Sequence, residues 1–357
     1  MPNRREFVKT VAGATVALCA GERVMRAQTP AARRQVSVAG KRVKVIDVHA
    51  HWDMPLGDVV KGTPYEKDRA TGPGLDDRIA AMDKLGVDVE AISVNDFWWW
   101  EIKDQGLARA ICNKHNETLA AWSRQHPDRF VGMASIPLQF PDVAVTMLED
   151  ATKRLGARAV AIGGHVNGES LSAPKFDVFW AKVQELGQLA FMHPNGSANL
   201  VQQNALSGRG GLGNIVGNPL ETTVFLSRLI FDGTFDKFPN LKVCGAHGGG
   251  YLPSYFQRTE VACDVRGNAM CANKKHPREY LKSNIMADTM VLTDEGLRHL
   301  VAEMGVSQVV YGTDNPLNWP VPVEMIVNHS TLTDDQKIQI LSGNLMKLLK
   351  ITSAATA

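Results

Sequence analysis

Apolar runs alternate with amphipathic runs along most of the chain. Between the apolar runs, apolar residues recur at helical spacing over residues 75–86, 107–126, 141–156, 176–187, 219–238 and 294–305. The short, nearly continuous apolar runs predict eight strands, at residues 43–49, 87–94, 130–137, 158–163, 188–193, 241–247, 284–289 and 308–314. Strands that are apolar throughout and separated by helices indicate a parallel sheet that is buried on both faces.

Eight strand-helix units in roughly 310 residues favour an α/β fold of the (β/α)8, TIM-like barrel type. A doubly wound sheet is disfavoured because no GxGxxG turn follows the first strand run. Residues 332–351 predict a helix-turn-helix cover over the barrel wall. Residues 194–217 carry no regular signal and predict a flexible active-site loop or lid.

The N-terminal residues differ in character from the rest of the chain. Arg4 and Arg5 precede Phe-Val-Lys and an uncharged segment rich in Ala and Val, which resembles a twin-arginine export signal. We therefore expect residues 1–32 to be a signal and linker, residues 33–357 to be one barrel domain, and the protein to be periplasmic. The apolar segment is far shorter than the roughly 20 residues that span a bilayer, so no stable membrane anchor is expected. A basic tail without a targeting role is the alternative.

Composition and charge narrow the class of protein. The chain is 44% hydrophobic and 21% charged, which is typical of a globular protein. A net charge of +2 gives no support for a nucleic-acid partner. The five cysteines form no CxxC pair, and we expect free, mostly buried thiols, with a Cys263–Cys271 pair as the alternative.

Five residues that can carry chemistry stand at the ends of predicted strands. In VIDVHAHWDMP, His49 and His51 are two positions apart, so they point to the same side of a strand. His193, His247 and Asp314 end the fifth, sixth and eighth runs. Barrels of this type assemble their active sites at the C-terminal ends of the strands, so we expect these side chains to meet there.

Three histidines, one aspartate and an exchangeable water would form a catalytic metal site. The absence of thiolates from this group favours zinc first, with manganese, iron or cobalt open. No lysine ends the fourth run, where a carbamylated lysine could bridge two ions. We therefore expect one divalent metal per chain.

Longer blocks of sequence then point to a family. The stretches RFVGMASIPLQFPDVAV, FPNLKVCGAHGGG and YGTDNP lie within a region, from about Val43 to Ile351, that resembles the amidohydrolase superfamily. The similar branch is the one typified by 2-amino-3-carboxymuconate-6-semialdehyde decarboxylase, amidohydrolase-related family 2.

The resemblance assigns roles to individual residues. It implies that His247 is the general acid and base, and that Arg266 binds a substrate carboxylate across the interface of a homodimer. It also implies the set of metal ligands, which is His49, His51, His193 and Asp314.

Departures from the family pattern leave the substrate open. Asn195 replaces a common tryptophan after the fifth strand, and Asn315 replaces a tyrosine in the GTDYP motif. Residues 53–74 match poorly, so a second carboxylate-binding arginine is not assigned, and Arg69 is only a candidate. His165 and Trp98 to Trp100 either line the pocket or serve in packing.

The resemblance and the five residues together predict a metal-dependent, cofactor-independent decarboxylase, a carbon–carbon lyase acting on a small unsaturated or aromatic carboxylic acid. A hydrolase or hydratase of a lactone, amide or conjugated acid could use the same site. The remaining alternative is an exported metal- or ligand-binding protein without catalysis. The presence of His247 beside a full ligand set argues against it, because a binding protein needs no general base.

Overall fold

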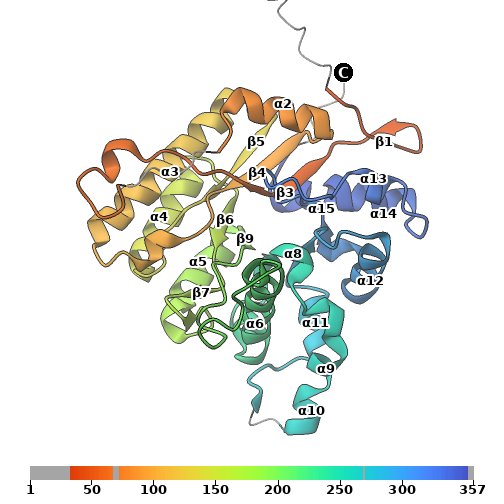
Figure 1. Cartoon of the computed structure of the whole chain (residues 1–357). Coiled ribbons are helices and arrows are strands. Elements are labelled where there is room, and N and C mark those ends of the chain that lie inside the picture. The colour runs from red at the N-terminus through yellow and green to blue at the C-terminus, as the bar shows by residue number, and fades with distance from the viewer. Residues whose placement is uncertain (1–32, 67–71, 268–269, 353–357) are drawn as a thin grey trace, which may run out of the picture. The chain divides into compact units, whose positions relative to one another are not determined.

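A parallel sheet forms the centre of the protein in the computed structural model, which describes residues 33–66, 72–267 and 270–352 (Figure 1). The sheet has eight strands in the order β12-β11-β10-β9-β6-β5-β4-β3. Their bounds are β3 Ile46–His51, β4 Val89–Ser93, β5 Phe130–Ala134, β6 Ala159–Ile162, β9 Leu189–Met192, β10 Lys242–Gly245, β11 Ile285–Asp288 and β12 Val309–Val310. Every neighbouring pair is parallel, as the apolar runs predict.

The first and last strands close the sheet into a barrel. Val48 N–H donates to the Tyr311 carbonyl at 3.0 Å, and His51 N–H donates to the Asn315 carbonyl at 2.8 Å. Ala50 and Asn315 form a parallel bridge between these two hydrogen bonds. The predicted (β/α)8 barrel is thereby confirmed, and the ends of β3 and β12 lie side by side.

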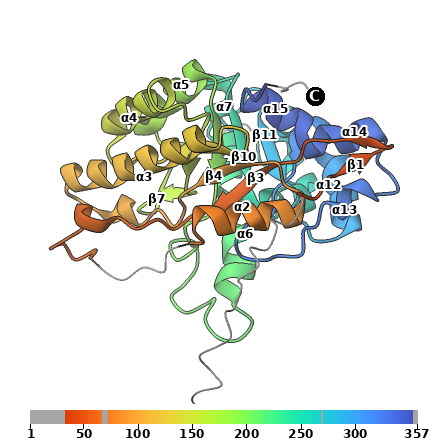
Figure 2. The ribbon, with the colours of Figure 1, turned by 90° about the horizontal axis from the view of Figure 1, so that it is seen from above.

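Helices surround the sheet on its outer side (Figures 1 and 2). The longer ones are α2 Leu75–Leu85, α3 Gln105–Gln125, α4 Pro141–Lys153, α5 Asp177–Leu186, α6 Asn218–Phe231 and α12 Asp294–Met304. Local sequence sets several of their ends. Asp104 and Thr293 cap α3 and α12 by accepting backbone N–H groups, and Gly86 ends α2 with φ of 78°.

The remaining short elements belong mainly to the connections. They are β1 Ser37–Val38, β2 Lys41–Arg42, β7 His165–Val166, β8 Glu169–Ser170, α7 Thr234–Lys237, α8 Ala246–Gly249, α9 Phe256–Glu260, α10 Ala262–Arg266, α11 Pro277–Leu281 and α13 Glu324–Val327. Residues 194–217, predicted as a loop, contain no strand, and a π-helical turn at Gly213–Gly217 leads into α6.

The C-terminal cover differs from its prediction. α14 Asp334–Ile338, a π-helical turn at Gln339–Gly343 and α15 Asn344–Leu348 follow one another without a break. They form one continuous helical stretch, so the predicted helix-turn-helix is wrong. Ile340 and Leu341 in the wide turn are buried, and Gly343 has helical backbone angles, with φ of −55° and ψ of −43°, so it does not end the helix.

The tryptophan cluster serves in packing. Trp99 and Trp100 are at most 1% exposed, and both indole N–H groups donate to the Ile136 carbonyl at 3.1 and 2.8 Å. This outcome supports the packing alternative for these two residues. Among the described residues, no helix combines the length and hydropathy that a bilayer crossing requires.

The cysteines correct the expectation of free thiols. Cys263 and Cys271 form a disulfide with Cα atoms 6.0 Å apart, because the chain turns back after α10. Cys112 and Cys244 are free and buried, as expected. Burial raises the pKa of both thiols well above its usual value.

This pairing predicts the thiol count of the protein. Five cysteines less the two in the disulfide leave three, so the denatured full-length chain should titrate as three thiols before reduction and five after. Peptide mapping by mass spectrometry should recover Cys263 linked to Cys271 under non-reducing conditions. Five thiols before reduction would contradict the disulfide.

Candidate active site

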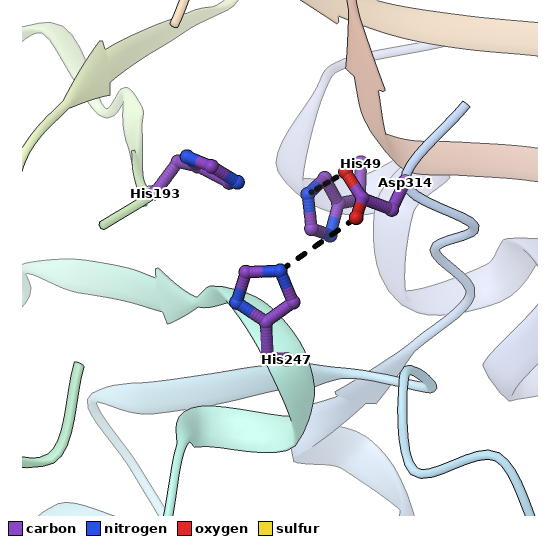
Figure 3. A group of neighbouring side chains, drawn as sticks. All are labelled: His49, His193, His247 and Asp314. Atoms are coloured by element: carbon purple, nitrogen blue, oxygen red, sulfur yellow. Dashed lines mark ion pairs between the residues drawn. The ribbon is translucent and has the colours of Figure 1, made fainter. Parts of the chain in front are cut away.

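The five predicted residues meet at the C-terminal end of the barrel. His49 and His51 lie in β3, and His193 directly follows β9. His247 lies two residues beyond β10 and Asp314 four residues beyond β12, so the predicted strands at 241–247 and 308–314 extended too far. Figure 3 shows His49, His193, His247 and Asp314 facing one another across the end of the barrel.

The ligating atoms of these residues are close together. One such atom each from His49, His193, His247 and Asp314 lies within 4.8 Å of the others. His51 belongs to the same group, because its Nε2 is 3.0 Å from His49 Nε2 and 2.5 Å from Asp314 Oδ1. Asp314 turns Oδ1 toward the two β3 histidines and Oδ2 toward His247 Nε2, which is 3.8 Å away.

Burial and hydrogen bonds set the protonation of the group. Burial keeps His51 neutral by lowering its pKa to about 4, and it lowers the pKa of His193 well below the usual value. Burial also opposes the charged form of His49, but Asp288 and Asp314 outweigh it and raise the pKa of His49 to about 10. Burial opposes ionisation of Asp314, yet hydrogen bonds from the histidines hold its pKa far below the usual range.

These side chains fit a divalent metal ion. Neutral imidazoles and a carboxylate are ligands that zinc and manganese accept. His193 Nδ1 and His247 Nδ1 are buried and have no hydrogen-bond partner among the described residues. One ligand atom each from His49, His193, His247 and Asp314 lies within 4.8 Å of the others, and His51 Nε2 lies 3.0 Å from His49 Nε2, so one ion could be reached from either set of three histidines and Asp314.

Asp288, which ends β11, is a site residue that the sequence analysis missed. Its carboxylate is fully buried and accepts from His49 Nδ1 at 2.6 Å. It also accepts backbone N–H groups from His247 at 3.1 Å and Gly248 at 2.7 Å. His247 has φ of 58°, an uncommon conformation for a residue with a side chain, and these bonds hold it there.

A buried ion pair lies behind His51. Arg78 and Glu90 are fully buried, with Arg78 Nε 2.6 Å from Glu90 Oε2. Arg78 also donates to the His51 carbonyl at 2.6 Å, and Asn315 Nδ2 donates to Glu90 Oε1 at the same distance. The pair therefore connects the backbone of β3 with the residue that follows Asp314.

Glu221 of α6 holds the loop that carries His193. Its carboxylate accepts backbone N–H groups from Gly164 at 2.9 Å, Asn195 at 3.0 Å and Gly196 at 2.6 Å. His165 belongs to the same region, and its Nε2 lies 3.1 Å from the Gly196 carbonyl. His165 is thus placed for loop structure rather than in the histidine group.

The structure describes only one of the two candidate arginines, and that one lies apart from the histidine group. Arg266 is exposed at the end of α10, which lies apart from α8 in Figure 1. Arg69 lies outside the described residues.

A cavity of about 340 Å³ opens beside His247. Its walls come from the loops after β9, β10, β11 and β12, together with α12. Side chains that line it include Ile215, Tyr251, Met290, Leu292, His299 and Trp319. The cavity is therefore mainly apolar and aromatic, and His247 is one of the residues that line it.

The amidohydrolase family model matches residues 46–351, which is most of the chain. The chain belongs to the amidohydrolase family. Among its relatives, 2-amino-3-carboxymuconate-6-semialdehyde decarboxylase of Dictyostelium discoideum is 32% identical over 280 residues, covering 77% of this chain and 76% of that protein. The resemblance noted in the sequence is thereby confirmed.

Solved structures of similar proteins show the same fold. 5-Carboxyvanillate decarboxylase from Sphingomonas paucimobilis has a TM-score of 0.77 at 21% identity, covering 87% of this chain and 100% of its own. Dihydroxybenzoic acid decarboxylase from Polaromonas, with bound manganese and the inhibitor 2-nitroresorcinol, has a TM-score of 0.75 at 24% identity, covering 86% and 97%. All three relatives are named as decarboxylases, the class of carbon–carbon lyase that the sequence predicts.

The buried ion pair predicts a large loss of stability when one partner changes. Glu90→Gln leaves the Arg78 charge buried without its counter-ion, so the free energy of unfolding should fall by about 3–5 kcal/mol. Urea unfolding measures this loss. Asp150→Asn, which breaks the exposed Asp150–Arg154 pair on α4, is the control and should leave the midpoint nearly unchanged. Equal midpoints for both variants would contradict a supporting role for Glu90.

Proposed function

We propose that the protein is a metal-dependent decarboxylase of a small unsaturated or aromatic carboxylic acid. The observation that carries this proposal is the convergence of His49, His51, His193 and Asp314 with His247 beside an apolar cavity. The family membership and the named activities of the relatives support the same reaction class.

In this proposal the four predicted ligands hold one divalent ion, and His247 remains free for proton transfer. The ligand chemistry favours zinc, and the manganese of the Polaromonas relative makes that ion the alternative. When bound, the ion supplies Lewis-acid chemistry by polarising a substrate oxygen or lowering the pKa of a water.

His247 is proposed to carry the proton. Its Nε2 is 3.8 Å from Asp314 Oδ2 and the residue lines the cavity, so it could deliver a proton to the substrate carbon that bears the carboxyl group. Protonation of that carbon lets the bond to the carboxyl group break, and CO2 leaves. The apolar walls, Trp319 among them, would hold the ring or conjugated chain during this step.

We also propose a homodimer in which Arg266 of the partner subunit binds the substrate carboxylate. The segment around α10 carries exposed apolar side chains, with Val265 76%, Met270 68% and Tyr255 65% exposed. An interface that includes this segment would cover these side chains. For Arg266 to bind the carboxylate, the segment must pack beside the cavity of the other subunit, where a bidentate hydrogen bond to a carboxylate suits a guanidinium.

We further propose that residues 1–32 direct export to the periplasm by the twin-arginine route. The Arg4–Arg5 pair and the apolar segment after it support this assignment. The Cys263–Cys271 disulfide is of the kind that oxidising compartments maintain, which also favours export.

The reaction is tested by metal content together with CO2 release from a panel of aromatic and unsaturated acids. Wild-type protein should hold about one divalent ion per chain. Asp314→Asn should lose the ion and the activity. His247→Asn should keep the ion and lose at least about 100-fold in kcat. Wild-type protein without a bound ion, or an active His247→Asn variant, would overturn the proposal.

The reaction products distinguish a decarboxylase from the alternative, a hydrolase or hydratase. CO2 should appear in equal amount to the decarboxylated acid, with no water-addition or hydrolysis product. A hydrolysed lactone or amide, or a hydrated acid, formed without CO2 would instead favour the hydrolase or hydratase.

The proposed partner arginine predicts complementation between two inactive variants. A homodimer of Arg266→Ala or of His247→Ala has no complete site, but a mixed dimer has one, formed by His247 of one chain and the other chain's arginine. Random exchange of subunits should therefore restore about a quarter of the wild-type activity. Arg258→Ala, another exposed arginine near this segment, is the matched control and should be active alone. No recovery on mixing would contradict a shared site.

A further inference from the structure

We propose that Asp288 and Asn95 are positioning residues that place the imidazole proton of His49 and His51 on Nδ1, which leaves Nε2 free to bind the metal. This inference rests on the function proposed above, because it concerns two of the proposed ligands. It assigns a role to two buried polar side chains that flank β3 from different strands, β11 and the segment after β4.

The Asp288 carboxylate is surrounded by hydrogen-bond donors, and this sets the tautomer of His49. Three of its partners are backbone N–H groups, those of His247, Gly248 and Met290, at 2.7 to 3.1 Å. The fourth is His49 Nδ1, 2.6 Å away. A carboxylate surrounded by donors accepts, so Nδ1 carries a proton. Nε2 of His49 faces His51 and Asp314. A metal that displaces the proton shared between Nε2 and Asp314 would bind Nε2, while Asp288 keeps the other proton on Nδ1.

Asn95 contacts His51 in a different way. Its Nδ2 lies against His51 Nδ1, while its Oδ1 is buried and has no hydrogen-bond partner among the described residues. In this arrangement His51 Nδ1 accepts, so its proton is on Nε2 and meets Asp314 Oδ1 at 2.5 Å. That tautomer cannot bind a metal through Nε2.

A half-turn of the Asn95 amide would give Oδ1 a hydrogen-bond partner and would let His51 carry its proton on Nδ1. Oδ1 would then accept from a protonated Nδ1 of His51 and gain the partner that it lacks. Nε2 of His51 would lose its proton and become a ligand. An amide at position 95 can thus serve either tautomer of His51, whereas the ionised carboxylate of Asp288 can only accept.

Two substitutions at position 95 separate this role from simple packing. Asn95→Asp offers only acceptor oxygens when ionised, so it should keep the affinity for Mn2+ or Zn2+ at the wild-type level or higher. Asn95→Leu has a similar volume and no acceptor, so it should weaken binding by about 10- to 100-fold. Affinity is measured by competition with a chelator, without reference to activity.

Asp288→Asn tests the other ligand. The amide introduced at position 288 has one NH2 group, and this donor must face either His49 Nδ1 or the backbone N–H groups. Metal affinity should therefore also fall by about 10- to 100-fold. Nitrogen-15 chemical shifts of zinc-loaded protein should show His49 bound through Nε2 with its proton on Nδ1 in the wild type, and this pattern should be lost in the variant. Asp236→Asn is the control, because that carboxylate accepts from Tyr280 and Lys274 in a different part of the fold.

The outcomes separate this inference from the proposed function. Wild-type protein that binds no metal would overturn the proposed function, and this inference with it. Wild-type protein that binds metal, with Asn95→Leu and Asn95→Asp equal in affinity, would overturn the role of Asn95 alone. Unchanged affinity and His49 shifts in Asp288→Asn would overturn the role of Asp288. If that variant does not fold, the position-95 pair decides the inference.

Discussion

The site depends on closure of the barrel between β3 and the chain after β12. Hydrogen bonds from Val48 to Tyr311 and from His51 to Asn315 bring together residues 263 and 264 positions apart. Because these bonds lie in the backbone, the spacing between the β3 histidines and Asp314 is fixed by the ladder rather than by side-chain packing. A shift of one residue would turn His49 and His51 to the other face and dismantle the group.

Closure also creates an electrostatic cost that the surrounding residues offset. Asp47, Glu90, Asp288 and Asp314 are carboxylates with almost no exposure around one end of the barrel. Each has a donor: Thr313 for Asp47, Arg78 for Glu90, and histidines or backbone N–H groups for the other two. The negative charge is least well compensated at Asp47, where burial and the neighbouring Glu90 raise the pKa to about 7. The polar residues behind the site are therefore interdependent, and a change in one alters the charge balance of the rest.

The sequence predicts the parts of this arrangement that depend on strand period and chain direction. Apolar runs locate the strands, and residues at the ends of parallel strands must share one edge. The grouping of His193, His247 and Asp314 can therefore be predicted from the sequence. Asp288 ends the seventh run and follows the same rule, but the sequence does not show that its carboxylate accepts from the His49 ring and from the backbone of His247. In the sequence, Arg78 looks like a residue on the exposed face of an amphipathic helix. Its pairing with Glu90 depends on how α2 packs. The disulfide and the unbroken C-terminal helix likewise depend on tertiary geometry that local patterns do not encode.

The division between strand ends and loops explains how the site can be rigid and open at once. The proposed ligands lie on strands or within four residues of them, where ladder bonds hold the backbone. The cavity beside His247 is lined instead by loop residues such as Ile215, Leu292 and Trp319, which have no ladder partners. His247 belongs to both regions, because Asp288 fixes its backbone and it also lines the cavity. The barrel thus fixes where a metal and a proton donor would stand, while the shape of the substrate is left to loops that can change without disturbing the ligands.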